Sequence, residues 1–430
     1  MFSNIRLRRP AWLRRRMLLG ALVASMFPQP SFSIDMKDPF YGTGGISGSG
    51  GTNGTYVNSS GIIVSGSAPR YDHDPVTLQL MGWLIEGAST NMFIRSGDFS
   101  NAAWTKTGLT ATLGENAPDN SSNGAVLEIT DITTEPSVSQ TRNNAVRTIV
   151  SCFIKAGGAS PSTFATVKLA TVATTNVEVL IAVNLADGTF DSSGTYHTVD
   201  VRQWRNGWWR VSLCVDAQAG QVSNTMHVRP GYLTGYTVGQ TCLVWGGQCE
   251  ETSSGFVSSA TSYIPTTTAT VNRTSDTLVA VNSGGVANDS SITLMAEFAI
   301  GTVSSGNIRA VLHLSDGTGI NMTRIIVQTT GVSCVSVTSG GISQASINGA
   351  AMTLRQFTKV CARLMTNNMS MYENGALVGS DLAGTVPGVT NSLRLGTSSG
   401  GGNNPLNGWI REVKCYRSPI PEGAAKNITA

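Results

Sequence analysis

Charged residues are scarce in this chain of 430 residues, because Asp, Glu, Lys and Arg together make up 13%, about half of their usual share. The formal net charge is only +3, and six arginines between residues 6 and 16 supply much of the positive charge. Phosphate binding needs a clustered basic face, so this distribution argues against nucleic acid as a partner. Hydrophobic residues still reach 40%, which excludes a disordered composition.

The sequence also lacks any long amphipathic helical pattern and any repeat of solenoid period, which argues against a helical bundle and a parallel β-helix. It contains instead short runs of period two, such as residues 148–155 and 292–300, between turns rich in Gly, Ser, Thr and Asn. Such runs are typical of strands. The sequence therefore predicts an all-β protein with two β-sandwich (jelly-roll) domains after an extended Gly/Ser-rich N-terminal arm.

Seven cysteines are present, but the number is odd and no C-x-x-C pair occurs. This spacing argues against a zinc ribbon. Free thiols buried on strands are the main prediction, because free Cys is among the most buried residue types. A bridge between Cys242 and Cys249 is the alternative, and it would suit an oxidising compartment.

The first 70 residues carry no pattern of a folded domain. In residues 1–33 the arginines precede the apolar run Met17–Phe27, as in a bacterial signal peptide with a possible cleavage after Ser33. The run is short for a membrane span, and the alternative is an arm that anchors the protein against another one. Residues 34–70 are mostly Gly, Ser, Thr and Asn, which predicts an arm or linker without a core.

One hairpin supplies the candidate binding residues. Asn206-Gly207 predicts a tight turn, because both positions tolerate positive φ. In the strand that follows, Trp209 aligns with Val211, Leu213 and Val215, whereas Trp208 aligns with Arg210 on the opposite face. Aromatic rings stack on sugars and Arg bonds their hydroxyls, so Trp208, Arg210 and Trp204 are the candidate carbohydrate-binding residues. The preferred interpretation is nevertheless that each Trp lies in a core or a subunit interface.

The sequence contains few candidate metal ligands. Asp289 and Asp316 could provide oxygen ligands for calcium, with a plain turn at 316–319 as the alternative. Asp72-His73-Asp74 could form a ligand cluster, but a solvated loop is the preferred interpretation. No other cofactor is predicted.

Catalytic patterns are missing too. The sequence has no H-E-x-x-H, and Gly396–Gly400 matches G-x-S-x-G but is followed by Gly and Asn rather than by a helix. A retaining glycosidase needs two converging carboxylates, and the sequence offers no such run. We therefore expect that the protein is not an enzyme.

Two separated segments resemble the phage head-spike fibre domain, a family with a strand plan like that of jelly-roll carbohydrate-binding modules. The first is Gly82–Trp104, and the second comprises Trp245–Glu250, Thr261–Thr266 and Val271–Asp276. The resemblance covers roughly residues 70–277, and its pattern contains no fixed sugar ligand. It implies a jelly roll over 71–265, followed by a Thr-rich connector over 266–285.

Residues 286–418 resemble the concanavalin A-like and laminin G-like sandwiches, which implies a sandwich domain over 286–430. The resemblance rests on Met369–Gly379, with its Asn374-Gly375 turn, and on the closing segment Leu406–Arg417. This superfamily includes lectins, adhesion modules and some glycosidases, so the fold alone does not establish a function.

Together these resemblances imply a bacteriophage virion structural protein, a spike or fibre subunit of the head or tail that adheres to host-surface glycans. The expected partners are further copies in a homotrimer, other virion proteins through the N-terminal arm, and host-surface polysaccharide. A capsule-depolymerising glycosidase on the concanavalin A-like fold is one alternative. A secreted bacterial lectin or adhesin is the other, with secretion replacing the virion as the location.

Overall fold

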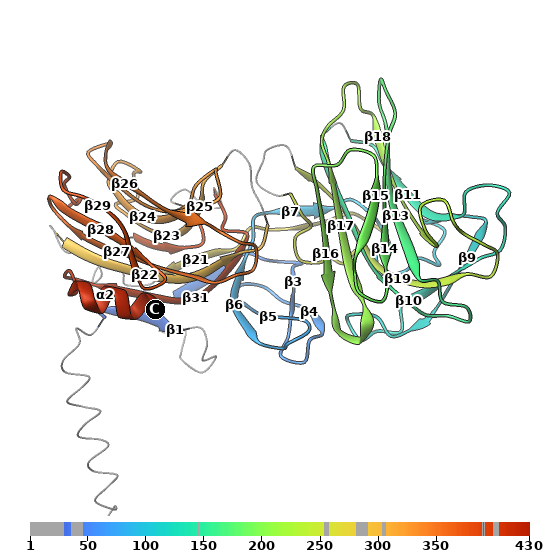
Figure 1. Cartoon of the computed structure of the whole chain (residues 1–430), viewed down its shortest axis with the longest axis horizontal. Helices are drawn as coiled ribbons and strands as arrows, with labels where there is room; N and C mark the ends of the chain where they lie inside the picture. The colour runs from blue at the N-terminus through green and yellow to red at the C-terminus, as the bar shows by residue number, and fades with distance from the viewer. Residues whose placement is uncertain are drawn as a thin grey trace, which may run out of the picture.

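The protein consists of two β-sandwiches that lie side by side along its long axis (Figure 1). This computed structural model describes residues 30–35, 46–144, 146–252, 258–280, 291–302, 307–388, 390, 392–398 and 404–430. The predicted all-β fold with two sandwiches is confirmed. In the described part of the chain, no helix is long and apolar enough to cross a membrane.

The first sandwich (right in Figure 1) consists of two antiparallel sheets whose inner faces form one core. One sheet has the order β16 (Thr198–Gln203), β17 (Trp209–Val215), β12 (Arg147–Lys155), β19 (Thr241–Thr252), β10 (Gly124–Ile129) and β9 (Leu109–Glu115). The other has the order β15 (Phe190–Ser193), β14 (Val177–Asn184), β13 (Phe164–Val172), β18 (Ser223–Pro230), β11 (Ser137–Arg142) and β8 (Thr105–Thr107). Alternation of side chains along each strand places every second one in this core.

The second sandwich has a larger core and includes both ends of the described chain. Its first sheet runs β29 (Ala376–Asp381), β28 (Asn368–Glu373), β27 (Thr358–Met365), β22 (Ser291–Ile300), β31 (Gly408–Tyr416), β6 (Leu80–Ile85) and β5 (Arg70–His73), and β1 (Phe32–Asp35) also pairs with β31. Its second sheet runs β2 (Ile46–Ser49), β21 (Thr277–Ala280), β30 (Ser392–Leu395), β23 (Arg309–Ser315), β24 (Met322–Val327), β25 (Val332–Ser339) and β26 (Ile342–Ala351). The short helix α2 (Glu422–Thr429) packs on the outer side of the first sheet.

The expected boundaries at residues 70 and 71 are wrong. Instead of forming an arm outside both sandwiches, residues 34–70 contribute β2 and half of β1 to the second sandwich. β5 and β6, expected in the first jelly roll, pair with each other and extend the sheet beyond β31. Pairing satisfies backbone groups that an isolated extended segment would leave to water, and composition alone does not reveal it. The first sandwich is thus inserted between two parts of the second.

The Thr-rich connector also contains strands. β20 (Val271–Arg273) pairs with β7 (Ser89–Asn91), and β21 lies between β2 and β30. The hairpin of β3 (Thr55–Val57) and β4 (Ile63–Ser65) packs against the first sandwich, where Val57 and Ile63 join a small aromatic cluster. The two sandwiches therefore share several connecting elements rather than one linker.

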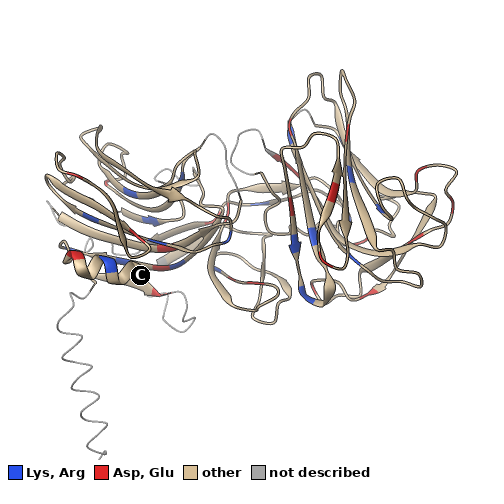
Figure 2. Cartoon of the chain, in the orientation of Figure 1, with Lys and Arg blue, Asp and Glu red and all other residues tan. Residues whose placement is uncertain are grey.

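All seven cysteines are buried and unpaired, as the main prediction stated. Cys242 and Cys249 both lie on β19, and seven residues of strand span roughly 23 Å, so these two thiols cannot form a bridge. Of the predicted signal-like segment, residues 1–29 lie outside the described part. Lys and Arg are scattered along the strands of both sandwiches (Figure 2).

Candidate ligand-binding pocket between the sandwiches

The predicted hairpin turn is present and connects β16 to β17. Asn206 and Gly207 both have positive φ, at 57° and 77°, and the Trp204 amide donates to the Trp208 carbonyl over 2.7 Å. The turn fixes the register in which Trp209 faces the core of the first sandwich, where its indole N–H donates to the Leu185 carbonyl over 3.0 Å. The assignment of Trp209 to the core face is confirmed.

The opposite face of β17 is covered as well. Trp208 is only 1% exposed and Arg210 only 7%. The β3–β4 hairpin covers this face, and Val57, Ile63 and Trp208 belong to one buried cluster. The Trp208 indole N–H donates to the Asn116 carbonyl over 3.2 Å. The preferred interpretation of Trp208 as a core residue is confirmed, although the segment that covers it had been assigned to an arm without a core.

A pocket lies where the two sandwiches meet, with about 670 Å³ of empty space that includes its mouth. Trp204, Arg202 and Arg210 line it from the first sandwich. From the second sandwich and the connecting strands come Tyr56, Asp72, His73, Asn407 and Trp409. Ligand pockets favour such domain junctions and such mixtures of aromatic and polar groups. Two of the three predicted sugar-binding residues, Trp204 and Arg210, thus share a real cavity.

The third residue, Trp208, borders a separate hollow of about 470 Å³. Trp204 lines this hollow too, together with Pro118, Asn120 and Asn206. Because Trp208 is almost fully buried, it forms part of the wall and cannot offer a free ring face. The structure therefore separates Trp208 from Arg210, which line different cavities.

The Arg202 guanidinium is the least satisfied cation of the pocket. Its carbon lies 5.5 Å from the centre of the Trp204 ring, and within the described residues it makes no hydrogen bond or ion pair. Burial and the neighbouring positive charge of Arg355 lower the pKa of Arg202 to about 10. The side chain is therefore still cationic at neutral pH, but its charge is less stable than that of an exposed arginine.

Arg210 lies deeper in the same wall. Its Nη2 donates to the Ser151 hydroxyl over 3.3 Å, and its Nε is buried without a hydrogen-bond partner. The indole nitrogen of Trp204 is likewise buried and without a partner. Buried donors without acceptors are rare in folded proteins and call for an explanation, such as a ligand or water.

Asp72, which had been considered as part of a metal cluster, holds the pocket together. Its carboxylate accepts from the Val57 amide over 2.6 Å and from the Trp409 indole N–H over 2.8 Å. Burial raises the pKa of Asp72, and these hydrogen bonds only partly oppose the effect. The carboxylate thus fixes the β3–β4 hairpin and the ring of Trp409, rather than facing a metal.

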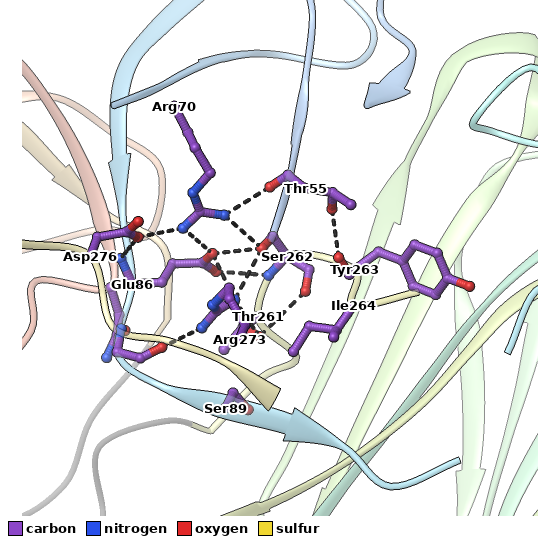
Figure 3. Close-up of polar contacts among 12 residues, drawn as sticks. Thr55, Arg70, Glu86, Ser89, Thr261, Ser262, Tyr263, Ile264, Arg273 and Asp276 are labelled. Carbon is purple, nitrogen blue, oxygen red and sulfur yellow. Dashed lines mark hydrogen bonds and ion pairs between the residues drawn. The ribbon is translucent and has the colours of Figure 1, made fainter. Parts of the chain in front are cut away.

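A buried cluster of four charges (Figure 3) adjoins the pocket, and its Glu86 is part of the pocket lining. Both Arg70 and Arg273 donate to Glu86 Oε2 at 2.9 Å, and Arg70 also pairs with Asp276. The Ser262 amide donates to Glu86 Oε1 over 2.7 Å. Burial alone would raise the pKa of Glu86, but Arg273 and Arg70 outweigh it and lower the pKa to about 2.

This charge cluster unites the segments that carry the head-spike resemblance. Glu86 belongs to Gly82–Trp104, Ser262 to Thr261–Thr266, and Arg273 and Asp276 to Val271–Asp276. Residues far apart in the sequence thus meet at the junction of the sandwiches. Every charge in the cluster has a partner of opposite sign, so the cluster joins the sandwiches.

No group of three or more His, Cys, Asp or Glu within the described residues could hold a metal ion. The Asp316 carboxylate accepts from the Thr318 amide and hydroxyl, at 2.8 and 2.7 Å, and from the Asn321 amide at 2.8 Å. These bonds shape a turn. Asp289 lies outside the described residues.

Comparison with known proteins agrees with the fold of the second sandwich. Residues 273–423 match the family model described as the concanavalin A-like lectin/glucanases superfamily, which confirms the predicted concanavalin A-like, laminin G-like domain. No curated protein sequence matches the chain.

Among solved structures, the CBM40 module of the Ruminococcus gnavus IT-sialidase, bound to α2,3 sialyllactose, is 14% identical, with 33% of this chain and 83% of that chain covered and a TM-score of 0.29. Domain 4 of the Geobacillus stearothermophilus arabinanase AbnA, in complex with arabinotriose, is 12% identical, with 36% and 73% covered and a TM-score of 0.30.

Sequence reasoning missed the residues that the second sandwich and the β3–β5 region bring to the pocket. Tyr56 was assigned to the arm, and Asn407 and Trp409 were seen only as part of a closing strand. The one available signal was Tyr71-Asp-His-Asp74, where a buried acid alternates with half-buried neighbours, as in a strand.

Proposed function

We propose that the protein binds carbohydrate in the pocket between its two sandwiches. The observation that carries this proposal is the pocket itself, in which the half-buried ring of Tyr56 accompanies guanidinium and indole donors without acceptors. Aromatic faces stack on the C–H faces of sugars, and fixed donors bond their oxygens. The match of residues 273–423 to a superfamily of lectins and glucanases supports the same class of ligand.

The test is a screen of the full chain against a glycan array, followed by titration calorimetry of the glycans that bind. Trp204→Ala should abolish binding, whereas Trp104→Ala, which removes a core indole on a different cluster, serves as a control for general destabilisation. Retained binding by the Trp204 variant would contradict the assignment of the pocket.

In this proposal the biological setting is a bacteriophage particle, in which the protein is a spike or fibre subunit that attaches to host glycans. Support comes from the head-spike resemblance, whose segments Gly82–Trp104 and Val271–Asp276 meet in the charge cluster. Mass spectrometry of purified virions should detect the chain. Its recovery instead from culture medium, in cells without phage particles, would favour a secreted adhesin.

The proposal includes a homotrimer, as expected of spikes and fibres. Light scattering of the full chain should give three times the mass of 45.1 kDa. A monomer at micromolar concentration would contradict it.

We propose binding without hydrolysis. The acidic side chains of the pocket, Asp72 and Glu86, are held by protein donors, so neither is placed as a free acid and base pair. The alternative, a glycosidase, is favoured by one observation, the raised pKa of Asp72, which is typical of a general acid. Release of oligosaccharides from host capsule, lost in Asp72→Asn, would establish the enzyme.

A further inference from the structure

We propose that the pocket selects sugars that carry a carboxylate, and that Arg202 binds this group. This inference rests on the proposed carbohydrate-binding function and adds the chemical class of the ligand. It depends on how the charges around the pocket are already paired.

Arg202 lies beside a carboxylate that is not available to it. Asp200, two residues earlier on β16, forms a two-pronged pair with Arg355 of the second sandwich, at 2.6 and 3.1 Å. Alternation along the strand places both Asp200 and Arg202 on the same face. Since both oxygens of Asp200 are directed at Arg355, Arg202 keeps a charged group with five N–H donors and no acceptor within the described residues.

The acidic side chains that line the pocket do not act as a direct counter-ion of Arg202 either. Asp72 is near enough to Arg202 to influence it electrostatically, but its two oxygens already accept from Val57 and Trp409. Glu86 accepts from both arginines of the charge cluster. A carboxylate that enters with the ligand would therefore meet a guanidinium without a direct counter-ion.

Arg210 and Trp204 line the same cavity, and each has a buried nitrogen without a partner, the Nε of Arg210 and the indole nitrogen of Trp204. An ionised carboxylate has about four lone-pair sites and can accept from several donors at once. Hydrogen bonds between charged partners are about twice as strong as neutral ones. A neutral sugar hydroxyl would satisfy these donors less well, which is the physical reason for the selectivity.

The experiment compares matched ligands by titration calorimetry on the full chain. One pair is 3′-sialyllactose and lactose, and the other is an oligogalacturonate and its methyl ester, which has the same sugar without the charge. We expect each acidic ligand to bind at least about ten-fold more tightly than its neutral partner, the value of one charged hydrogen bond. A preference in only one pair would identify the source of the carboxylate as a sialic or a uronic acid.

The variants test whether Arg202 is responsible. Arg202→Gln should remove the acidic preference and leave any neutral binding unchanged, and Arg202→Lys should retain part of it because the charge remains. Arg147→Gln is the matched control, since Arg147 pairs with Asp216 away from the pocket lining. Equal melting temperatures would show that the variants fold.

The outcomes separate the two proposals. If acidic and neutral partners bind equally, the carboxylate preference is overturned and carbohydrate binding stands. If acidic ligands are preferred but Arg202→Gln binds them as well as the wild type does, the role of Arg202 is overturned. Binding of none of the ligands, here or on the glycan array, would overturn both.

Discussion

Two pairs of arginines lie at the junction of the sandwiches, and their surroundings differ. Arg70 and Arg273 are fully buried, and each forms ion pairs or hydrogen bonds with Glu86 or Asp276. Arg202 and Arg210 line the pocket, and neither makes an ion pair within the described residues. Burial without a partner is costly for a charge. The charges of the first pair are therefore compensated by acidic side chains of the protein, whereas the second pair has no direct counter-ion within the described residues.

The comparison shows why a sequence resemblance and a binding site need not coincide. The segments that resemble the head-spike domain supply Glu86, Arg273 and Asp276, which hold the sandwiches together. The pocket residues Arg202 and Trp204 lie outside those segments. Motif residues can thus be structural, and the ligand contacts can vary around them.

Removal of the acid that Arg70 and Arg273 share should have the largest effect on stability. Glu86→Gln leaves Arg70 and Arg273 buried with too little negative charge, so we expect the free energy of unfolding to fall by roughly 3–5 kcal/mol. Urea denaturation would measure the loss. Asp216→Asn is the control, because Asp216 pairs with Arg147 at the surface and its loss should cost about 1 kcal/mol or less.

The two neighbouring tryptophans extend the comparison. Trp208 and Trp209 are both buried, so Trp208→Ala and Trp209→Ala should each destabilise the protein by roughly 3–5 kcal/mol. Thermal unfolding of both variants would check it, and a Trp208 variant as stable as the wild type would show that the β3–β4 hairpin does not cover this face in solution.

Low pH should weaken the ion pairs of Arg70 and Arg273 with Glu86 before it affects the rest of the pocket. The pKa of Glu86 is lowered from 4.5 to about 2, so its stabilising contribution is complete above pH 4.5 and is lost as the pH falls toward 2. The pKa of Asp276 is raised by burial, which acts in the opposite direction. Unfolding free energies between pH 5 and 2.5 should fall less steeply for Glu86→Gln, and identical slopes would exclude Glu86 as the titrating group.

Replacement of Arg202, which has no ion pair, should hardly affect stability. Arg202 is half-buried and gives up no ion pair, so Arg202→Gln should change the free energy of unfolding by less than about 0.5 kcal/mol. A larger loss in urea denaturation would mean that Arg202 has a structural partner in solution.

The smallest effect concerns the turn at Asp316. Its carboxylate is used by Thr318 and Asn321, so addition or chelation of calcium should leave the melting temperature unchanged. A rise with calcium that disappears in Asp316→Asn would reinstate the metal site.

The sequence by itself determined the local structure of this protein. Period-two runs predicted the strands, Asn206-Gly207 predicted the turn, and the alternation after it correctly placed Trp209 in a core. These features depend on neighbouring residues, whose preferences are set by backbone geometry and side-chain direction.

Only the tertiary structure decided which strands pair across long distances and what covers each face. β1 joins β31 across nearly the whole chain, and the β3–β4 hairpin buries Trp208, although both segments looked like parts of a loose arm. Short strands rich in Gly and Ser carry little hydrophobic pattern of their own, so their position is determined by the sheet edges that they complete. The pocket follows from the same pairings, because its two walls come together only after the first sandwich is inserted into the second.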